Sequence, residues 1–283
     1  MSKIRKIAQQ IRHAPGIEHA EVLWNLLRKP YHQLLNSSGT GVTVSVGGSC
    51  IVRIPPEFCG ENWESYEPEA INALVSWLEK HPTALLLDIG CAIGLFSVAS
   101  LFVSDQLEVV AFDSDLASLK ATQRMCQYTS GNRLRLVHGF VSNVHSSGLG
   151  LNAATAKTQQ ALSTSSVTGD PGTNAYICLD GNTDHTIPTS SLDGLFLENF
   201  PSRPILLKCD VEGAELLVLH GAEKLLKHLS PQLLLSVHPS VLPGYGHSVS
   251  DVREYLEAAG YQIKILAVDH EEHWWCEKTS IPV

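Results

Sequence analysis

The segment Leu85–Val98, LLLDIGCAIGLFSV, decides the fold of this chain. Its apolar run ends at Asp88 and predicts a buried strand, after which a glycine-rich turn from Gly90 to Gly94 opens a predicted helix. Only glycine lets a backbone come this close to a ligand. A dinucleotide-binding turn has the spacing Gly-x-Gly-x-x-Gly, whereas the spacing here is Asp-x-Gly-x-x-x-Gly. The segment therefore predicts a nucleoside-binding strand, turn and helix of a different kind.

A second strand is predicted in Leu107–Asp115, LEVVAFDSD, and it ends at Asp113. A carboxylate at such a strand end can accept both hydroxyl hydrogens of a ribose. The alternative for an acidic residue in this place is a helix cap, and Asp115 is positioned to cap the helix predicted at Leu116–Tyr128. We favour ribose binding for Asp113, because the glycine turn independently indicates a nucleoside.

From Glu67 onward, strands and helices alternate, which is typical of parallel βαβ units. The expected class is α/β, with a doubly wound, seven-stranded and mostly parallel sheet. The last two strands, joined by the short turn Val268–Glu272, are expected to form an antiparallel hairpin at the sheet edge. Helices are expected after the first, second, fourth and fifth strands. The strands are predicted at about Ala84–Asp88, Glu108–Phe112, Arg133–His138, Ile205–Asp210, Leu233–His238, Gln262–Ala267 and His273–Glu277.

Two further regions lie outside this repeating pattern. Residues 1–65 are expected to form an N-terminal cap of two short helices and a hairpin at Gly41–Ile54 that turns at Gly47-Gly48. Residues 66–283 form the predicted catalytic domain. Within it, Ser146–Thr173 is rich in Ser, Thr, Ala and Gly and predicts a mobile insertion, either a lid or a disordered loop.

Composition restricts the classes of partner and location. The formal net charge of -9 disfavours nucleic acid as a partner, because most of the surface repels a polyanion. The seven cysteines lack the spacing of a disulfide framework or a zinc site and indicate reduced thiols in the cytoplasm. No apolar run approaches the roughly 20 residues that span a bilayer, and no secretory signal is expected. The sequence leaves the oligomeric state open.

Several motifs together resemble those of the FkbM-type methyltransferase family, from about Tyr66 to His238. The Asp-Val-Glu-Gly-Ala-Glu motif that begins at Asp210 is the most specific of them, and the glycine turn resembles the first motif of class I methyltransferases. The resemblance implies an S-adenosylmethionine-dependent enzyme that methylates a hydroxyl of a sugar, glycolipid, polyketide or similar secondary metabolite. The segments that carry it are Tyr66–Lys80 (YEPEAINALVSWLEK), Ala111–Asp115 (AFDSD), Thr189–Leu195 (TSSLDGL) and Ile205–Leu226 (ILLKCDVEGAELLVLHGAEKLL).

The resemblance also implies where the cofactor lies. The glycine turn would wrap its amino-acid end, with Asp88 facing the ammonium group, and the adenine would lie near Phe140 and Val141. Phe140 is equally well explained as a core residue. The family commonly has Glu-Pro in place of Asp113-Ser114 and Ala-Asn in place of Cys91-Ala92, and both changes are mild. The expected cofactor contacts are Tyr66, Glu67, Asp88, Gly90, Cys91, Ala92, Gly94, Asp113, Ser114, Phe140, Val141 and Asp210.

The expected catalytic residues are Asp210, Glu212 and His238, which follow two predicted strands at the edge where open α/β sheets bind ligands. Methyl transfer is a direct displacement, so the protein must align the two reactants and remove a proton. His238 has a suitable pKa for a general base, although a single histidine can also be structural. Asp210 and Glu212 could instead cap a helix, or hold a divalent cation that activates the hydroxyl. We favour the histidine, because the sequence offers no full set of metal ligands.

The polar cluster His270, Glu271, Glu272 and His273 is expected to be a solvated turn, because successive residues of a strand point to opposite faces. His273 is the member that could line the acceptor site.

Two rival functions share this fold. A nicotinamide-dependent oxidoreductase would need a tighter glycine fingerprint and a proton relay such as Tyr-x-x-x-Lys, and the motif spacing disfavours it. A non-catalytic nucleoside-binding module is disfavoured by the intact Asp210 and Glu212.

Overall fold

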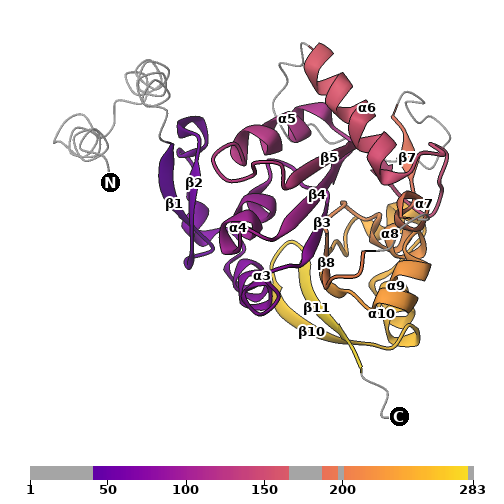
Figure 1. The fold of residues 1–283 in the computed structure, drawn as a ribbon. Helices are drawn as coiled ribbons and strands as arrows, with labels where there is room; N and C mark the ends of the chain where they lie inside the picture. The colour runs from indigo at the N-terminus through magenta and orange to yellow at the C-terminus, as the bar shows by residue number, and fades with distance from the viewer. Residues whose placement is uncertain (1–40, 166–186, 197–200, 280–283) are drawn as a thin grey trace.

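The computed structural model describes residues 41–165, 187–196 and 201–279, and a seven-stranded sheet lies at its centre. Its strands are β3 (Leu85–Ile89), β4 (Glu108–Asp113), β5 (Leu134–His138), β8 (Ile205–Cys209), β9 (Gln232–Val237), β10 (Tyr261–Val268) and β11 (Glu272–Lys278). They lie in the order β10-β11-β9-β8-β3-β4-β5 (Figure 1). The strands from β9 to β5 pair in parallel, and the hairpin β10–β11 joins β9 in antiparallel pairing. The predicted fold class and sheet are confirmed.

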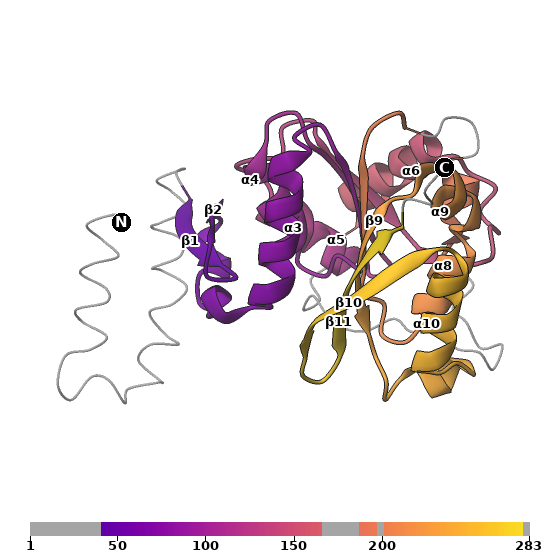
Figure 2. The same cartoon turned by 90° about the horizontal axis from the view of Figure 1, so that it is seen from below.

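Helices cover both faces of this sheet. Successive residues of β3 point to opposite faces, so Leu86 belongs to one apolar cluster while Leu85 and Leu87 belong to another. Because both faces are covered, every residue of β3 is buried and the strand is apolar up to Asp88. The helices of the first face are α3 (Pro68–Lys80), α4 (Leu95–Val103) and α5 (Leu116–Met125). The helices of the second face are α7 (Leu192–Leu195), α8 (Glu215–His220), α9 (Glu223–Leu229) and α10 (Val249–Ala258). Figure 2 shows α3 and α4 on one side and α8, α9 and α10 on the other.

The parallel register brings the predicted site residues to one edge. Strands β9, β8, β3 and β4 are neighbours, and Ile89 pairs with Cys209 on one side and Phe112 on the other. The residues that directly follow these strands, or end them, therefore lie at the same carboxyl edge. They are His238, Asp210, Gly90 and Asp113.

The predicted hairpin before the catalytic core is confirmed. Strands β1 (Val42–Val46) and β2 (Cys50–Ile54) pair antiparallel, and Gly47 and Gly48 turn between them at positive φ. The hairpin packs into the same apolar cluster as α3 and α4. Two short 3-10 turns, η1 (Pro56–Phe58) and η2 (Trp63–Ser65), lead from it to α3. The helices predicted before residue 40 lie outside the described residues.

The prediction of a structureless insertion is wrong for its central part. Residues 151–164 form helix α6 (Leu151–Thr164), which buries Leu151, Ala154, Thr158 and Leu162. These positions share one helix face that packs against β5, and the Thr158 hydroxyl accepts a hydrogen bond from the His138 amide. A helix therefore follows the third strand as well, which the sequence analysis did not predict. Residues 166–173 lie outside the described part of the chain.

Three smaller elements complete the described fold. Strands β6 (Phe140–Val141) and β7 (Thr189–Ser190) form a short parallel pair beside the sheet, and η3 (Leu242–Tyr245) follows β9. Within the described ranges, no helix combines the length and the apolar character that crossing a membrane requires.

Candidate functional site

The glycine turn after β3 packs directly against the segment that follows β8. Gly90 has φ 75°, and a Cβ atom added there would lie 1.8 Å from the carbonyl oxygen of Asp210. Gly94 has φ 82°, and its added Cβ would lie 2.7 Å from the Thr122 side chain. Both positions therefore require glycine, for their backbone conformation and for space. The turn fixes the predicted cofactor motif beside the predicted catalytic motif.

Asp113 ties the glycine turn to the end of β4. Its Oδ2 accepts a hydrogen bond from the Ala92 amide and its Oδ1 accepts one from the Asp115 amide, both at 2.9 Å. Oδ1 keeps a further lone pair that can accept a hydroxyl hydrogen, and the second lone pair of Oδ2 is met only by the Cys91 thiol at 4.0 Å, a weak donor. Burial raises the pKa of Asp113 to about 6, although the two amide hydrogen bonds oppose the shift. Asp115 caps α5 by accepting from the Ala117 amide at 2.8 Å, so the cap and the candidate ribose ligand are different residues.

Asp88 is fully buried and is held inside the protein. The Ser97 hydroxyl donates to Asp88 Oδ2 at 2.6 Å, and Oδ1 lies 3.7 Å from Lys208 Nζ. The resemblance implies a direct contact between this carboxylate and a cofactor ammonium. In this conformation the buried Asp88 carboxylate cannot make that contact. Asp88 instead shapes the site through the residues that it contacts.

Lys208 is a central residue that the sequence analysis missed. It is buried in β8, and its Nζ donates to the Gly90 carbonyl at 3.0 Å and to Asp210 Oδ2 at 3.2 Å. Burial would lower the pKa of Lys208, but Asp210 and Asp88 outweigh this and raise it, so the side chain is a fixed cation. The available signal was a single lysine in an otherwise apolar strand.

His238 lies in a group of carboxylates just beyond β9. Its Nδ1 is 2.7 Å from Glu215 Oε1 and its Nε2 is 2.7 Å from Glu271 Oε2. The nearest oxygens of Asp210 and Glu212 are each 3.6 Å from Nε2. The structure therefore brings together the three predicted catalytic residues and adds two buried glutamates that the sequence analysis did not select.

This geometry disfavours His238 as the general base. Burial lowers the pKa of His238, but its hydrogen bonds to Glu215 and Glu271 raise it to about 10 overall. Both ring nitrogens then carry protons that they donate to carboxylates, so the ring is a cation at neutral pH. The same bonding leaves no ring lone pair for a metal ion, although Asp210, Glu212 and His238 are close enough to form a ligand group.

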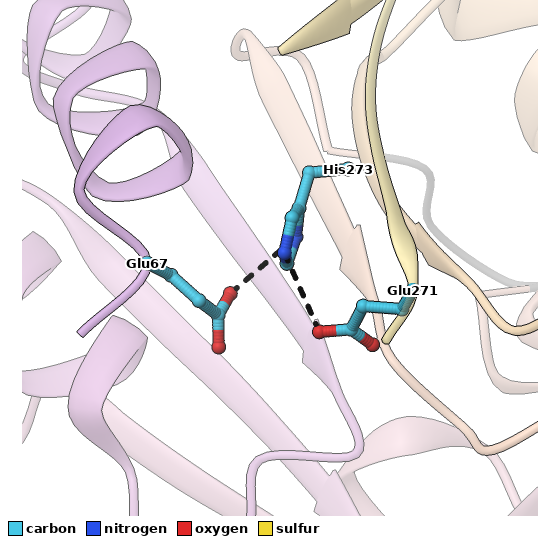
Figure 3. A group of neighbouring side chains, drawn as sticks. All are labelled: Glu67, Glu271 and His273. Carbon is cyan, nitrogen blue, oxygen red and sulfur yellow. Dashed lines mark ion pairs between the residues drawn. The ribbon is translucent and has the colours of Figure 1, made fainter. Parts of the chain in front are cut away.

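The expectation of a solvated turn at residues 270–273 is wrong for two of its members. Glu271 and His273 are buried, and Glu271 bonds to His238, whereas the His270 side chain is 79% exposed. His273 faces Glu67, which directly precedes α3 (Figure 3). The turn between β10 and β11 thus contributes residues to the site, although it is far along the chain from the other site residues.

Residues with strained backbone conformations lie at the same edge of the sheet. Four non-glycine residues within the described ranges have positive φ, and three of them are predicted site residues: Glu67, Ala92 and Glu212. Such conformations cost about 1–3 kcal/mol each and cluster at functional sites. Glu212 places its carboxylate beside His238 from this conformation, with 48% of its side chain exposed.

The remaining predicted cofactor contacts occupy several environments. Tyr66 packs edge-on against Phe96, with ring centroids 6.4 Å apart. The buried Cys91 thiol lies 4.0 Å from Asp113 Oδ2, and the Ser114 carbonyl lies 3.0 Å from His138 Nε2. Val141 is buried in the core and Phe140 is half-buried. A contact of either with adenine stays a prediction.

Comparisons with solved structures find methyltransferases of low sequence identity. The FkbM methyltransferase from Methylobacillus flagellatus KT is 16% identical with a TM-score of 0.45, covering 68% of this chain and 42% of that one. This chain therefore spans less than half of that relative. The precorrin-6y C5,15-methyltransferase from Geobacter metallireducens GS-15 is 11% identical, with a TM-score of 0.44 and coverage of 77% and 89%.

A third solved structure is magnesium protoporphyrin IX methyltransferase from Synechocystis PCC 6803 with bound SAH. It is 14% identical with a TM-score of 0.40, and the match covers 75% of this chain and 83% of that one. No curated protein matches the sequence. The family model "Methyltransferase FkbM domain" matches residues 88–263, from the end of β3 into β10. Because this match spans more than half of the 283 residues, the chain belongs to the FkbM methyltransferase family.

Proposed function

We propose that this protein is an S-adenosylmethionine-dependent O-methyltransferase that acts on a hydroxyl of a sugar, glycolipid or related secondary metabolite. The observation that carries the proposal is the packing of the Gly90 turn against Asp210. This packing supports the proposal because the glycine turn, which we propose binds the nucleoside, lies beside the carboxylates that we propose take part in proton removal. We further propose a cytoplasmic location, supported by five buried free thiols among the described residues.

The residues present suit this cofactor. Gly90 and Gly94 offer backbone without side-chain bulk, and Asp113 could accept two ribose hydroxyls if one of them displaces the weak contact of the Cys91 thiol. These residues would hold the nucleoside, with Tyr66, Cys91 and Ser114 around them. When bound, S-adenosylmethionine supplies an electrophilic methyl group on a positively charged sulfur.

Proton removal is the second task of the site, and Glu212 is the best placed residue for it. Both nitrogens of His238 are bonded to carboxylates, so the ring positions its neighbours and balances their charge. Asp210 is already engaged, because the Lys208 ammonium donates a hydrogen bond to its Oδ2 at 3.2 Å. Glu212 is half-exposed at the edge, and burial raises its pKa from the ordinary value. We assign to Glu212 the acceptance of the proton from the attacking hydroxyl.

Cofactor affinity should depend on pH through Asp113. The carboxylate must be ionised to accept two ribose hydroxyls, and its pKa is about 6 in the free protein. Affinity should be constant above this pH and fall by about tenfold per pH unit below it, because protonation then competes with binding. The groups that face Asp113 are Asp115, which raises its pKa, Lys208, which lowers it, and the Cys91 thiol.

Calorimetric titration of S-adenosylhomocysteine between pH 5 and 8 measures this dependence. The control is Asp113→Asn, which should bind more weakly but without the acidic fall. An equal fall in Asp113→Asn would assign the effect to another group.

The proposed reaction is tested by incubating the protein with methyl-labelled S-adenosylmethionine and a panel of glycosides, glycolipids and polyketides. A product that carries one labelled methyl on oxygen supports the proposal. Transfer only to nitrogen or carbon acceptors would contradict O-methylation, and failure to bind the cofactor would contradict the proposal as a whole.

A further inference from the structure

Two carboxylates and one imidazole meet beside the catalytic group in ion pairs, without hydrogen bonds to one another. Glu67 precedes α3, whereas Glu271 directly precedes β11 and His273 lies at its start, so the group joins distant parts of the chain (Figure 3). His273 is only 2% exposed, yet its Nε2 has no hydrogen-bond partner. Glu67 Oε2 is also buried without a partner. Buried polar atoms are nearly always satisfied, so these two require an explanation.

The two ion pairs within the group are longer than hydrogen bonds. Glu67 Oε2 lies 3.6 Å from His273 Nδ1, and Glu271 Oε1 lies 3.5 Å from His273 Nε2. A charge-assisted hydrogen bond between these groups would be about 2.7–2.9 Å long. His238 provides an internal comparison, because it makes two such bonds to carboxylates at 2.7 Å. The carboxylate oxygens nearest to the His273 nitrogens lie farther away than those of His238.

The 3.5 Å between Glu271 Oε1 and His273 Nε2 suits two ligands of one metal ion. Metal bonds of about 2.0–2.2 Å place neighbouring ligand atoms about 3.0–3.5 Å apart in octahedral or tetrahedral geometry. One ligand atom from each of Glu67, Glu271 and His273 lies within 4.8 Å of the others. Glu67, whose 3.6 Å contact is to Nδ1, would have to shift toward Nε2 to complete a set of three protein ligands.

Neighbouring residues hold two of these ligands in place. The Ser236 hydroxyl lies 3.4 Å from His273 Nδ1, which leaves Nε2 as the free nitrogen. The second oxygen of Glu271 accepts from His238 at 2.7 Å. Metal ligands are commonly oriented by such outer contacts. The second contact would also connect a bound ion to the catalytic group.

We propose that Glu67, Glu271 and His273 bind one divalent first-row transition metal ion, with Mn²⁺ and Zn²⁺ as the best matched. One imidazole with two carboxylates favours these ions over Ca²⁺, which prefers six to eight oxygen ligands. The site differs from the Asp210 and Glu212 site considered from the sequence. Its test does not depend on the proposed methyl transfer, because binding is measured without cofactor or acceptor.

The test is calorimetric titration of the chelator-treated full-length protein with MnCl₂ and, separately, with ZnCl₂. We expect one ion per chain, with affinity at least about tenfold weaker in Glu67→Gln and in His273→Gln. The matched control is His270→Gln, since His270 is an exposed histidine of the same turn that could form a surface site with Asp269 and Glu271. Its affinity should equal that of the wild type.

Spectroscopy of bound Mn²⁺ provides a second readout that does not need the buried variants to fold. Electron spin echo spectra should show coupling to one imidazole nitrogen in the wild type and in His270→Gln. The proposal is overturned if neither ion binds, or if binding is lost in His270→Gln. Binding that survives Glu67→Gln but is lost in Asp210→Asn would place the ion at the catalytic group instead, and would also overturn it.

Discussion

Replacing Glu212 with glutamine is expected to lower kcat by about 100- to 10,000-fold while changing cofactor affinity little. Glutamine keeps the size of the side chain but cannot accept a proton at neutral pH. The expectation rests on the half-exposed Glu212 carboxylate at the sheet edge, 3.6 Å from the His238 cation. It is measured as a turnover rate with an acceptor found by the labelled-methyl experiment.

Two further variants locate the proton acceptor. Glu223→Gln, an exposed glutamate of α9, is the matched control and should keep full activity. Asp210→Asn should have a smaller effect than Glu212→Gln, because Asp210 is paired with Lys208. A large loss in Asp210→Asn with near-normal activity in Glu212→Gln would move the role to Asp210. Normal activity in both would exclude these carboxylates as the proton acceptor.

Replacing Lys208 with methionine is expected to destabilise the protein by about 3–5 kcal/mol. The substitution leaves Asp88 as a buried carboxylate without its cation, since the two groups are 3.7 Å apart and Asp88 is fully buried. It also removes the hydrogen bond to the Gly90 carbonyl. Urea unfolding followed by circular dichroism measures the change.

The controls for this prediction separate charge from packing. Lys227→Met removes an exposed lysine of α9 and should change the stability by no more than about 0.5 kcal/mol. Adding Asp88→Asn to Lys208→Met should recover part of the loss, because the neutral amide needs no cation. If Lys208→Met is as stable as the wild type, the buried pair does not stabilise this fold.

The sheet could be predicted from the sequence because its strands are apolar runs at regular intervals. The Leu85–Ile89 strand, the glycine turn and the βαβ order all follow from local composition. Helix α6 was missed because its Ala, Thr, Ser and Gln residues resemble those of a loop. Its buried positions Leu151, Ala154, Thr158 and Leu162 nevertheless have helical spacing.

The candidate site was predictable only in part, because several of its contacts join distant segments. Asp210, Glu212 and His238 follow strand ends, where function is expected. The sequence predicts a solvated turn at residues 270–273, in which only His273 could line the acceptor site, yet residues two apart share a strand face, and both Glu271 and His273 are buried. Their link to Glu67 spans about two hundred positions, and no local pattern indicates it.

The central claim is that the turn at Gly90 and the carboxylate of Asp113 bind S-adenosylmethionine. Calorimetric titration of S-adenosylhomocysteine into the wild type, Asp113→Ala and Asp115→Ala tests it most directly. Losing the charged contact to the ribose should weaken binding at least about tenfold in Asp113→Ala. Asp115→Ala, which removes only the α5 cap, should bind as the wild type does, and NADH should not compete. Equal affinity in the wild type and Asp113→Ala, or displacement by NADH, would contradict the claim.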